Sequence, residues 1–598
     1  MKKTLFINGK AVEFDNETSI LEICRREGID VPAFCYQPEL SVYGACRMCL
    51  VEIEGRGIQS SCSMPPEEGM KVVTDNEQIQ KLRKINLELI LANHPNDCLT
   101  CGKSTNCKLQ AYAKRFGINR IRYKKVEKSY PDIIKKNVPE CALNAEACDG
   151  LPPKDMSSPS IMRDASKCIL CGCCVRACRE IQGVSALDFA FRGSNSFVLP
   201  AFGKGMGEGL CINCGQCAAV CPVGALLPMS NIKDAYKAIH DKSKVVVAAI
   251  APAVRVAMGE AFNGMYGEIV TGKIVTALKN IGVDYVFDIA HGADFTIMEE
   301  GTEFIKRKTT GDRLPQFTSC CPGWVKYIEQ AYPEMMYLLS SCKSPQQMFG
   351  AFAKDYLPKK LGKEAKDIII ISVMPCTAKK FEAKRPEFQR NGVPDIDIVI
   401  TTQELAMMIK ESGQDFVNLT LSEFDSPLGV QTGAGVIFGV SGGVTEAALR
   451  FAAETLTGEK RKVWEFEQVR GEDRGIRRAR LDVNGVELKL ALVSGLANAK
   501  QIIENIKNGT EEADLIEVMA CPGGCINGGG QPYQIDNRRV ARYCRSSGLY
   551  KADRELEIRN SQDNYDMQDQ YKNEIGEIGG HKAHELFHTK YKDRKNVG

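Results

Sequence analysis

The hydrophobic pattern is most regular from about residue 229 to the end of the chain. Short apolar runs alternate there with stretches of helical spacing, and the runs cover residues 245–251, 285–289, 367–373, 397–401 and 489–493. Strands interleaved with helices predict an α/β domain. The first run is apolar at almost every position, which is typical of a strand buried on both faces. Its carboxyl end is where an open α/β sheet usually places a ligand, so we expect a site there.

The first part of the chain has a different pattern. In residues 1–78, short β-patterned runs at 4–7 and 50–53 flank a helical stretch near 20–27, which predicts a small β-grasp domain. Its cysteines Cys35, Cys46, Cys49 and Cys62 have the spacing C-x10-C-x2-C-x12-C. The domain resembles a [2Fe-2S] domain of plant-ferredoxin type, although the spacing departs from the plant pattern. A zinc site is the alternative. Cys24, in the helical stretch, is interpreted as a buried small hydrophobe.

The cysteine content changes this picture more than the charge does. The chain has 598 residues, which suggests roughly four domains of about 150 residues, and it has 26 cysteines. With 78 Lys and Arg against 75 Asp and Glu, the net charge of +3 favours neither a nucleic-acid surface nor an acidic tail. No apolar signal region follows Met1, and no apolar run reaches the ~18 residues of a membrane helix. We therefore expect a cytoplasmic protein whose clustered cysteines bind metal instead of forming disulfides.

A second group of potential ligands combines one histidine with three cysteines. A helical pattern over residues 79–92 is followed by His94, Cys98, Cys101 and Cys107 in the spacing H-x3-C-x2-C-x5-C. Three thiolates and one imidazole are a common structural zinc set, and the spacing alone does not exclude zinc. We predict a small domain over residues 79–118 that holds either zinc or a [4Fe-4S] cluster.

Residues 161–228 contain the most specific spacing signal. The motif C-x2-C-x2-C-x3-C occurs twice, and in two-cluster ferredoxins the fourth cysteine of each run binds the other cluster. This rule predicts two [4Fe-4S] ligand sets: Cys168, Cys171, Cys174 and Cys221, and Cys178, Cys211, Cys214 and Cys217. Cys173 falls between ligands as a bystander. The preceding connector, residues 119–160, contains Cys141 and Cys148, which we interpret as unliganded thiols.

Three further motifs lie in the α/β region. They are Thr318-Ser319-Cys320-Cys321-Pro322, Met374-Pro375-Cys376 and Met519-Ala520-Cys521-Pro522-Gly523-Gly524-Cys525. Neighbouring side chains point to different sides of the backbone, so one of the two adjacent cysteines should bind metal and the other should stay free. Cys321, Cys376, Cys521 and Cys525 could then enclose one [4Fe-4S] unit, with Cys320 as a thiol beside it.

These motifs, together with Lys343-Ser344-Pro345-Gln346-Gln347, closely resemble the catalytic domain of [FeFe]-hydrogenases. The resemblance runs from about residue 1 to about residue 590, and it is closest to the long clostridial type and to catalytic subunits of soluble multisubunit hydrogenases. It favours iron–sulfur over zinc at His94, because that module matches the His-ligated [4Fe-4S] module of long hydrogenases and of a related complex I subunit. The implied fold is multidomain α+β and α/β, with a large α/β catalytic domain over residues 229–598.

The resemblance implies a second metal unit beside the catalytic [4Fe-4S] cluster. This unit, which completes the H-cluster, is a diiron centre with CO, cyanide and a dithiolate amine, and Cys525 bridges it to the cubane. Lys379 matches the cation that faces the cyanide ligands. The implied pocket is completed by backbone at Ala251 and Pro252, by Ser344 and Gln346, and by the apolar residues Met374, Phe438 and Met519. Ala253 and Cys342 depart from the family, whose members often have Ser and Ala at these positions.

Glycines accompany the last cysteine motif. Gly523-Gly524 and Gly528-Gly529-Gly530 would let the backbone approach a cluster closely. The alternative, a phosphate cradle, would need the Lys-Ser/Thr ending of a P-loop, which these segments lack.

A proton relay is also implied by the resemblance. It begins at Cys320 and continues through Glu300, Ser340 and Glu303, with Arg307 near the surface. A free thiol has an ordinary pKa of ~8.5, so it exchanges protons near neutral pH far more readily than a serine hydroxyl. Glu300 and Glu303 are three residues apart and would share a helix face. Without the resemblance, these glutamates would be interpreted as an ordinary polar helix face.

The implied activity is the reversible conversion of H2 into two protons and two electrons, with one [2Fe-2S] and three accessory [4Fe-4S] clusters as the electron path. Ferredoxin is the default electron partner, and an NAD(P)-linked flavoprotein with small [2Fe-2S] subunits is the second. Two alternatives remain: an H2-sensing relative with an altered proton relay, and a non-catalytic electron-transfer subunit. The helical, charged pattern of residues 582–595 is interpreted as a solvated face.

Overall fold

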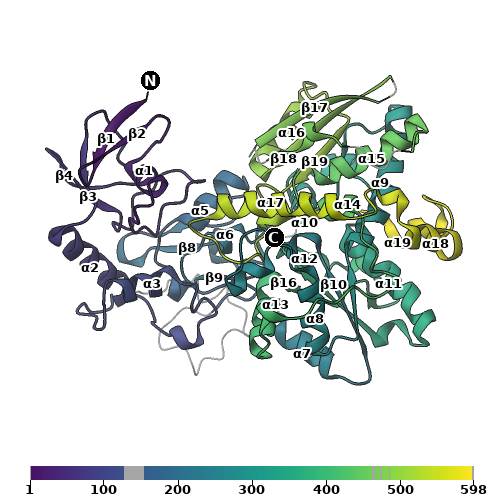
Figure 1. Ribbon diagram of the computed structural model, residues 1–598, viewed down its shortest axis with the longest axis horizontal. Coiled ribbons are helices and arrows are strands. Elements are labelled where there is room, and N and C mark those ends of the chain that lie inside the picture. The colour runs from purple at the N-terminus through teal and green to yellow at the C-terminus, as the bar shows by residue number, and fades with distance from the viewer. Residues whose placement is uncertain (1, 127–153, 461–464, 472–474, 484, 596–598) are drawn as a thin grey trace.

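The computed structural model describes residues 2–126, 154–460, 465–471, 475–483 and 485–595. Figure 1 shows two lobes: the N-terminal modules, coloured purple to blue, and a larger lobe that contains the α/β region. Most of the predicted connector, including Cys141 and Cys148, lies outside the described residues. Among the described residues, no helix is long and apolar enough to cross a membrane.

The first module is the predicted β-grasp fold. Its sheet has the order β2-β1-β5-β3-β4, and helix α1 begins after Ser19, whose side chain accepts a hydrogen bond from Glu22 N. The elements are β1 (Lys3–Ile7), β2 (Lys10–Phe14), α1 (Ile20–Arg26), β3 (Leu50–Ile53), β4 (Gly57–Ser60) and β5 (Lys71–Val73). Cys24 is fully buried in the core of this module, as predicted.

Short elements connect this module to the α/β region. Helices α2 (Glu77–Ala92) and α3 (Lys108–Arg115) flank the segment that contains His94 and its neighbouring cysteines. Two antiparallel two-stranded sheets follow. One pairs β6 (Ile161–Arg163) with β9 (Leu226–Pro228), and the other pairs β7 (Asp188–Ala190) with β8 (Phe197–Leu199). The repeated cysteine motifs lead into the short helices α5 (Cys173–Arg176) and α6 (Gln216–Ala219).

The α/β region is built on two four-stranded sheets. One has the order β11-β10-β13-β16 and is parallel throughout; the other has the order β12-β19-β18-β17, in which only β17 is antiparallel. Their strands are β10 (Val245–Ile250), β11 (Tyr285–Asp288), β13 (Ile368–Met374), β16 (Ile398–Thr401), β12 (Gln316–Phe317), β19 (Leu515–Met519), β18 (Val486–Ser494) and β17 (Gly475–Val483). All five predicted strands are present. Strands β12, β17 and β19 were not predicted.

Helices cover both sheets and bury the apolar strands, as expected for parallel sheets. The helices of this region, some of which pack on other helices, are α7 (Ile232–His240), α8 (Thr271–Ile281), α9 (Ala290–Thr310), α10 (Pro322–Ala331), α11 (Pro345–Leu361), α12 (Ala378–Glu382), α13 (Thr402–Glu411), α14 (Gly433–Ile437), α15 (Gly443–Thr457), α16 (Leu496–Lys507), α17 (Arg538–Glu555), α18 (Tyr565–Gln570) and α19 (His581–Phe587). A small ribbon of β14 (Gln389–Arg390) and β15 (Val393–Pro394) lies outside the main sheets. Val247 and Ile250 of β10 are fully buried, and burial of such a side chain contributes about 1.5–3 kcal/mol.

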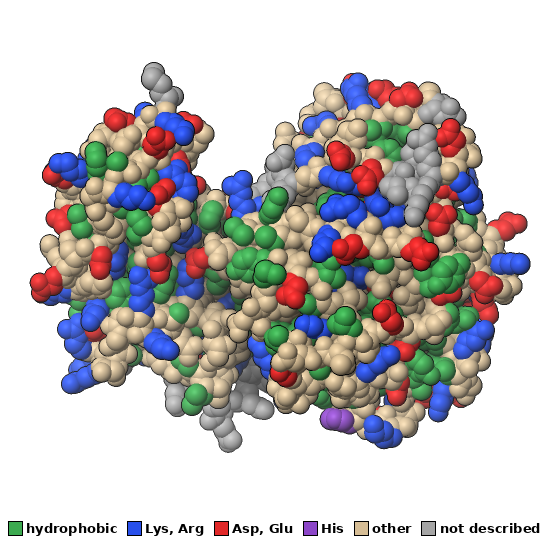
Figure 2. Space-filling view, viewed as in Figure 1, with side chains coloured by type: hydrophobic (Ala, Val, Ile, Leu, Met, Phe, Trp, Pro, Cys, Tyr) green, Lys and Arg blue, Asp and Glu red, His purple; other side chains and the backbone are tan. Residues whose placement is uncertain are grey.

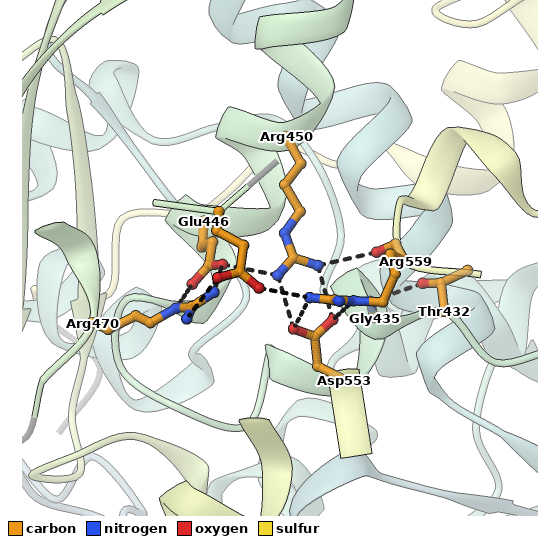
Figure 3. A network of polar contacts seen from close by, with 8 residues as sticks. Thr432, Gly435, Glu446, Arg450, Arg470, Asp553 and Arg559 are labelled. Carbon is orange, nitrogen blue, oxygen red and sulfur yellow. Dashed lines mark hydrogen bonds and ion pairs between the residues drawn. The ribbon is translucent and has the colours of Figure 1, made fainter. Parts of the chain in front are cut away.

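Buried ion pairs fix the helices around the second sheet. Arg450 of α15 donates to Glu446 in its own helix at 2.8 Å and to both oxygens of Asp553 in α17 at 2.9 Å. Arg470 and Arg559 complete the network, which Figure 3 shows. Gly433, the first residue of α14, lies so close to Asp553 that a Cβ there would be 1.9 Å from Asp553 Oδ1. The network therefore sets the position of the short helix that precedes Phe438.

Helix α17 also joins the two lobes. Its Arg542 donates to Glu39 of the first module at 2.8 Å, and both side chains are buried. Just before the helix, Asp536 accepts from Arg25 and from Lys108. Figure 1 shows this helix, in yellow, extending from the larger lobe toward the N-terminal modules. Figure 2 shows basic and acidic side chains interspersed over both lobes, consistent with the small net charge.

The prediction of a solvated helical face for residues 582–595 was wrong in part. Only His581–Phe587 is helical, and the segment after it pairs with residues 341–343, with Thr589 N donating to Ser341 O at 2.8 Å. Leu586 and Phe587 are buried. Most charged positions are exposed, although Lys582 and Arg594 are half-buried and Arg594 pairs with Glu329. The apolar positions pack against α9 and α11, because an amphipathic segment can cover a core while it presents charges to water.

Candidate active site

The cysteines of the three motifs in the α/β region line one cavity. Cys320 and Cys321 follow β12, Cys376 follows β13, and Cys521 and Cys525 follow β19. Parallel strands place their carboxyl ends on one edge of each sheet. The cavity lies where the β13 end of one sheet faces the β12 and β19 ends of the other, so motifs far apart in sequence meet here. The cavity measures about 740 Å³, including the part that is open to solvent, and its lining is almost entirely apolar.

Most of the residues predicted for the pocket line this same cavity. They are Ala251, Pro252, Gln346, Met374, Lys379, Phe438 and Met519. Ala251 and Pro252 lie at the carboxyl end of β10, as the strand pattern predicted. Ser344 does not line the cavity; it lies behind it, and its hydroxyl contacts Lys379 Nζ at 2.7 Å.

The glycines of the last motif allow backbone segments to pack against one another. Gly524 has a φ of 95°, and a Cβ there would be 2.6 Å from Ser441 N. A Cβ at Gly528 would be 2.2 Å from Pro375 O. The Gly528 contact holds the Cys376 and Cys525 loops together, and the Gly524 contact holds the Cys525 loop against residues 439–441. Both glycines let backbone segments approach one another at the edge of the cavity.

Lys379 is the cation of the cavity, and it is fixed from three sides. Its ammonium donates to Ser344 Oγ at 2.7 Å, to Glu382 Oε2 at 2.8 Å and to the carbonyl of Cys320 at 3.3 Å. Burial acts to lower the pKa of Lys379, but the Glu382 carboxylate outweighs it and the pKa is raised. The lysine therefore keeps its charge although it is buried. Gln346 also donates to Glu382, at 3.0 Å.

Glu300, Ser340 and Glu303 form a continuous polar path beside the cavity. Ser340 Oγ donates to Glu303 Oε2 at 2.9 Å, and Ser340 also contacts Glu300. Burial raises the pKa of Glu300 to about 8, against hydrogen bonds from Ser340 and from the Ser319 backbone that lower it. In the described part of the chain, Glu300 Oε1 is buried without a hydrogen-bond partner. Burial also raises the pKa of the Cys320 thiol, and the Glu300 carboxylate adds to this rise.

Arg307 was predicted to lie near the surface, but it is buried. Its side chain is only 3% exposed, and it donates to Glu303 Oε1 at 2.6 Å and to the carbonyls of Leu338 and Leu339. A guanidinium has five donors, so it can satisfy a carboxylate and several backbone carbonyls at once. The more exposed end of the path is Glu303 itself, at 14%.

The two ferredoxin-type cysteine sets each line a separate cavity. Cys168, Cys171, Cys174 and Cys221 line one, and Cys178, Cys211, Cys214 and Cys217 line the other. The fourth cysteine of each motif thus lies with the other motif, which is the crossed arrangement that the spacing rule predicts.

The N-terminal ligand groups are also brought together in part. In the first module, Cys35 Sγ lies 3.5 Å from Cys46 Sγ, and Cys62 contacts both Cys35 and Cys49. His94 Nε2 is buried and, within the described residues, has no hydrogen-bond partner, while Nδ1 accepts from Asn96 N at 3.2 Å. Such an orphaned buried nitrogen fits a metal ligand. Cys101 and Cys107 lie near each other, and Cys98 begins the short turn before Cys101.

Sequence reasoning missed two polar residues at these sites. Gln216, inside the second ferredoxin motif, donates to Cys521 Sγ at 3.1 Å and to Asn527 O at 2.9 Å. It therefore connects the cavity of Cys214 and Cys217 with the main cavity. The second is Glu382, which lies three residues after Lys379; this spacing on a helix was a usable signal.

The motifs and folds match known protein families over most of the chain. Residues 244–529 match the family described as "Iron only hydrogenase large subunit, C-terminal domain", and residues 539–594 match "Iron hydrogenase small subunit". Residues 2–77 match a 2Fe-2S iron-sulfur cluster binding domain, and residues 83–122 match the NADH-ubiquinone oxidoreductase-G iron-sulfur binding region. Residues 158–227 match the ferredoxin-like domain of NADH-quinone oxidoreductase subunit 3.

Individual relatives match along the whole length. The chain is 42% identical to "NADP-reducing hydrogenase subunit HndD" of Solidesulfovibrio fructosivorans, over 99% of each chain. It is 38% identical to "Iron hydrogenase 1" of Clostridium pasteurianum, over 99% of this chain and 100% of that one. Among solved structures, a variant of [FeFe]-hydrogenase HydA1 from Chlamydomonas reinhardtii matches with a TM-score of 0.55 and 38% identity, over 61% of this chain and 99% of that chain.

Proposed function

We propose roles for individual residues on the premise that the chain belongs to the [FeFe]-hydrogenase, or iron-only hydrogenase, family and interconverts H2 with two protons and two electrons. The iron–sulfur family matches of the N-terminal modules also favour iron–sulfur clusters over the zinc alternatives. The observation that carries the residue proposal is the single apolar cavity where all five cysteines of the three motifs meet.

The cavity fits the H-cluster by the chemistry of its donors. Cys321, Cys376, Cys521 and Cys525 would hold the [4Fe-4S] unit, and Cys525 would also bind the diiron centre through a second lone pair on its sulfur. When bound, that centre supplies the open iron site for H2 and a dithiolate amine as the nearby base. The apolar residues Met374, Phe438 and Met519 exclude water, and Lys379 provides buried positive charge for the cyanide ligands.

The protein moves protons between the cavity and the surface. Cys320 takes the proton at its sulfur and passes it to Glu300, whose unpartnered Oε1 is a buried acceptor. Ser340 then transfers a proton to Glu303 by exchange at its hydroxyl, since it contacts both carboxyl groups. Arg307 holds Glu303 in place through the contact at 2.6 Å. A carboxyl group with a pKa of about 8 can both accept and release protons near neutral pH.

The accessory ligand sets would carry electrons to and from the cavity. The set Cys178, Cys211, Cys214 and Cys217 would be nearest to the H-cluster, because Gln216 contacts Cys521 directly. The other ferredoxin-type set, Cys168, Cys171, Cys174 and Cys221, would come next. The His94 module and the [2Fe-2S] module would lie farther from the H-cluster. Two outer modules imply more than one electron partner.

An NAD(P)-linked flavoprotein with small [2Fe-2S] subunits is the favoured partner assembly. The support is the full-length similarity to a relative whose printed name is that of a subunit of an NADP-reducing hydrogenase. Ferredoxin and a cytoplasmic location remain predictions from the sequence alone.

The test is H2-driven reduction of an artificial dye by the full chain, purified without oxygen from a host that assembles the diiron centre. Rapid reduction is the expected result. If infrared bands of iron-bound CO and cyanide are present but no dye is reduced, the chain is an H2 sensor and the catalytic proposal is wrong. If the bands are absent from a preparation in which a relative assembles normally, the chain is an electron-transfer subunit.

A further inference from the structure

A polar branch leaves the proton path at Glu303 and ends in the C-terminal segment. Ser341 Oγ lies 3.2 Å from Glu303 Oε2 and 2.8 Å from His588 Nδ1. The other ring nitrogen of His588, Nε2, lies 3.0 Å from Glu299 Oε2. Ser341, His588 and Glu299 are not part of the relay described above, yet a continuous series of hydrogen-bond contacts joins them to Glu303.

Backbone pairing holds His588 in this position. The segment after α19 pairs with residues 341–343: Lys343 N donates to Phe587 O at 2.7 Å, and Cys342 and His588 form an antiparallel bridge. Thr589 N donates to Ser341 O at 2.8 Å, and the side chain of Tyr591 adds a hydrogen bond from its OH to the carbonyl of Cys342 at 2.9 Å. The neighbouring Phe587 is fully buried and stacks on Phe295 of α9 at 4.8 Å.

Glu299 is a fixed anionic partner for the imidazole. It is 2% exposed, Tyr571 OH donates to its Oε1 at 2.7 Å, and Gly579 N donates to its Oε2 at 2.9 Å. A buried carboxylate that is hydrogen-bonded in this way orients an imidazole and stabilises its protonated form. The groups that face His588 are Glu299, His584 of α19 and, through Ser341, Glu303. Lys306 of α9 lies farther out, near His584.

We propose that Glu303, Ser341 and His588 form a second proton outlet of this hydrogenase, with Glu299 as a positioning residue. The inference rests on the proposed relay through Cys320. During H2 oxidation, a proton on Glu303 moves to Ser341 Oγ while the hydroxyl proton of Ser341 moves to His588 Nδ1. Ser341 ends unchanged, Glu303 becomes a carboxylate, and His588 becomes an imidazolium paired with Glu299. H2 formation uses the same steps in reverse.

The outlet reaches water at the surface of α19. The His588 side chain is 9% exposed, and its ring lies 4.1 Å, between centroids, from the ring of the exposed His584. Serine, histidine and a carboxylate also form hydrolase triads, but there the serine contacts Nε2 and the carboxylate contacts Nδ1. In this protein the two contacts are exchanged, and Ser341 Oγ also lies against the Glu303 carboxylate. The arrangement therefore suits proton transfer between Glu303 and His588 better than nucleophilic attack.

The experiment compares His588→Ala, Ser341→Ala and Glu299→Gln with wild-type holoenzyme in H2-driven dye reduction. We expect each variant to lose between about twofold and tenfold in rate, because the outlet at Glu303 itself remains. The solvent isotope effect should increase in each. A His588→Ala/Glu299→Gln double variant should lose no more than His588→Ala alone, since both act on one step. The control is His581→Ala, at the exposed first residue of α19, and its rate should match wild type.

Chemical rescue separates a proton-transfer role from a structural one. Free imidazole should restore the rate of His588→Ala, whereas pyrrole, which has a similar ring but no basic nitrogen, should not. A wild-type rate and isotope effect in His588→Ala, with Cys320→Ala inactive, would overturn the outlet while the main relay stands. A slow His588→Ala enzyme that melts earlier and is not rescued would show a structural role only and would equally overturn it. Activity in Cys320→Ala would contradict the proposed relay itself.

Discussion

The Cys320 thiol lines the cavity and allows the relay to be tested at a single residue. Cys320→Ala should keep every cluster but reduce H2 turnover by at least about 100-fold, because alanine cannot carry a proton. Cys24→Ala is the control, because Cys24 is a fully buried thiol in the core of the first module and is not part of the relay. Dye reduction, iron content and infrared bands would be compared. Activity near wild type in Cys320→Ala would remove this cysteine from the relay.

Glu300 should make stability depend on pH. Its pKa is raised to about 8, from 4.5 for an exposed glutamate, by burial. Between these values the folded protein binds a proton that the unfolded chain has lost, so the contribution of Glu300 to stability falls as pH rises toward 8. In Glu300→Gln this loss is absent. The melting temperature of the variant relative to that of wild type should therefore rise between pH 5 and pH 8. The H2 turnover of the variant should fall. An equal pH dependence of the melting temperature in both proteins would argue against the raised pKa.

At the scale of the elements, the ion-pair network around α15 should be necessary for the position of α14. Replacing Arg450 by Leu leaves Glu446 and Asp553 buried with fewer positive partners, and we expect a loss of about 3 kcal/mol. Arg480→Leu is the control, because its pair with Glu512 is more than half exposed on both sides and should contribute less than about 1 kcal/mol. Thermal unfolding of the two variants gives the comparison, and equal shifts would contradict a special role for the network.

The elements also show what the sequence pattern could predict. The five apolar strand runs were found because each is buried on both faces. Strand β17 was missed because Arg477, Arg478 and Arg480 interrupt its apolar positions at the edge of the second sheet. Strand β12 has only two residues, too short for any period to be visible. Even so, β12 carries Cys320 and Cys321 at its carboxyl end, so a motif located the site where periodicity could not.

In the whole molecule, ligand spacing predicted which cysteines of the ferredoxin-type motifs lie together, whereas charge partners were predicted poorly. The crossed grouping of Cys168 to Cys221 follows from spacing alone. The contacts of His588 with Ser341 and Glu299 bring together residues separated by about 250 to 290 positions, and only the packing of the tail creates them. The buried pair of Glu39 with Arg542 joins the two lobes in the same way. Such pairs carry no local signal, because each residue by itself has the pattern of a surface charge.

The outer end of the electron path gives the last prediction, at His94. Replacing His94 by Cys should retain a [4Fe-4S] cluster at a lower reduction potential, because a thiolate adds negative charge where a neutral imidazole was bound. Rieske centres, in which histidines replace cysteines, lie roughly some hundreds of millivolts above plant-type ferredoxins, so a shift of about 100 mV or more is expected. Redox titration followed by electron paramagnetic resonance would measure it. An Asn96→Ala variant, which keeps the Asn96 backbone contact to His94 Nδ1, should leave the potential in place. An unchanged potential in His94→Cys would instead mean that the orphaned Nε2 of His94 binds no iron.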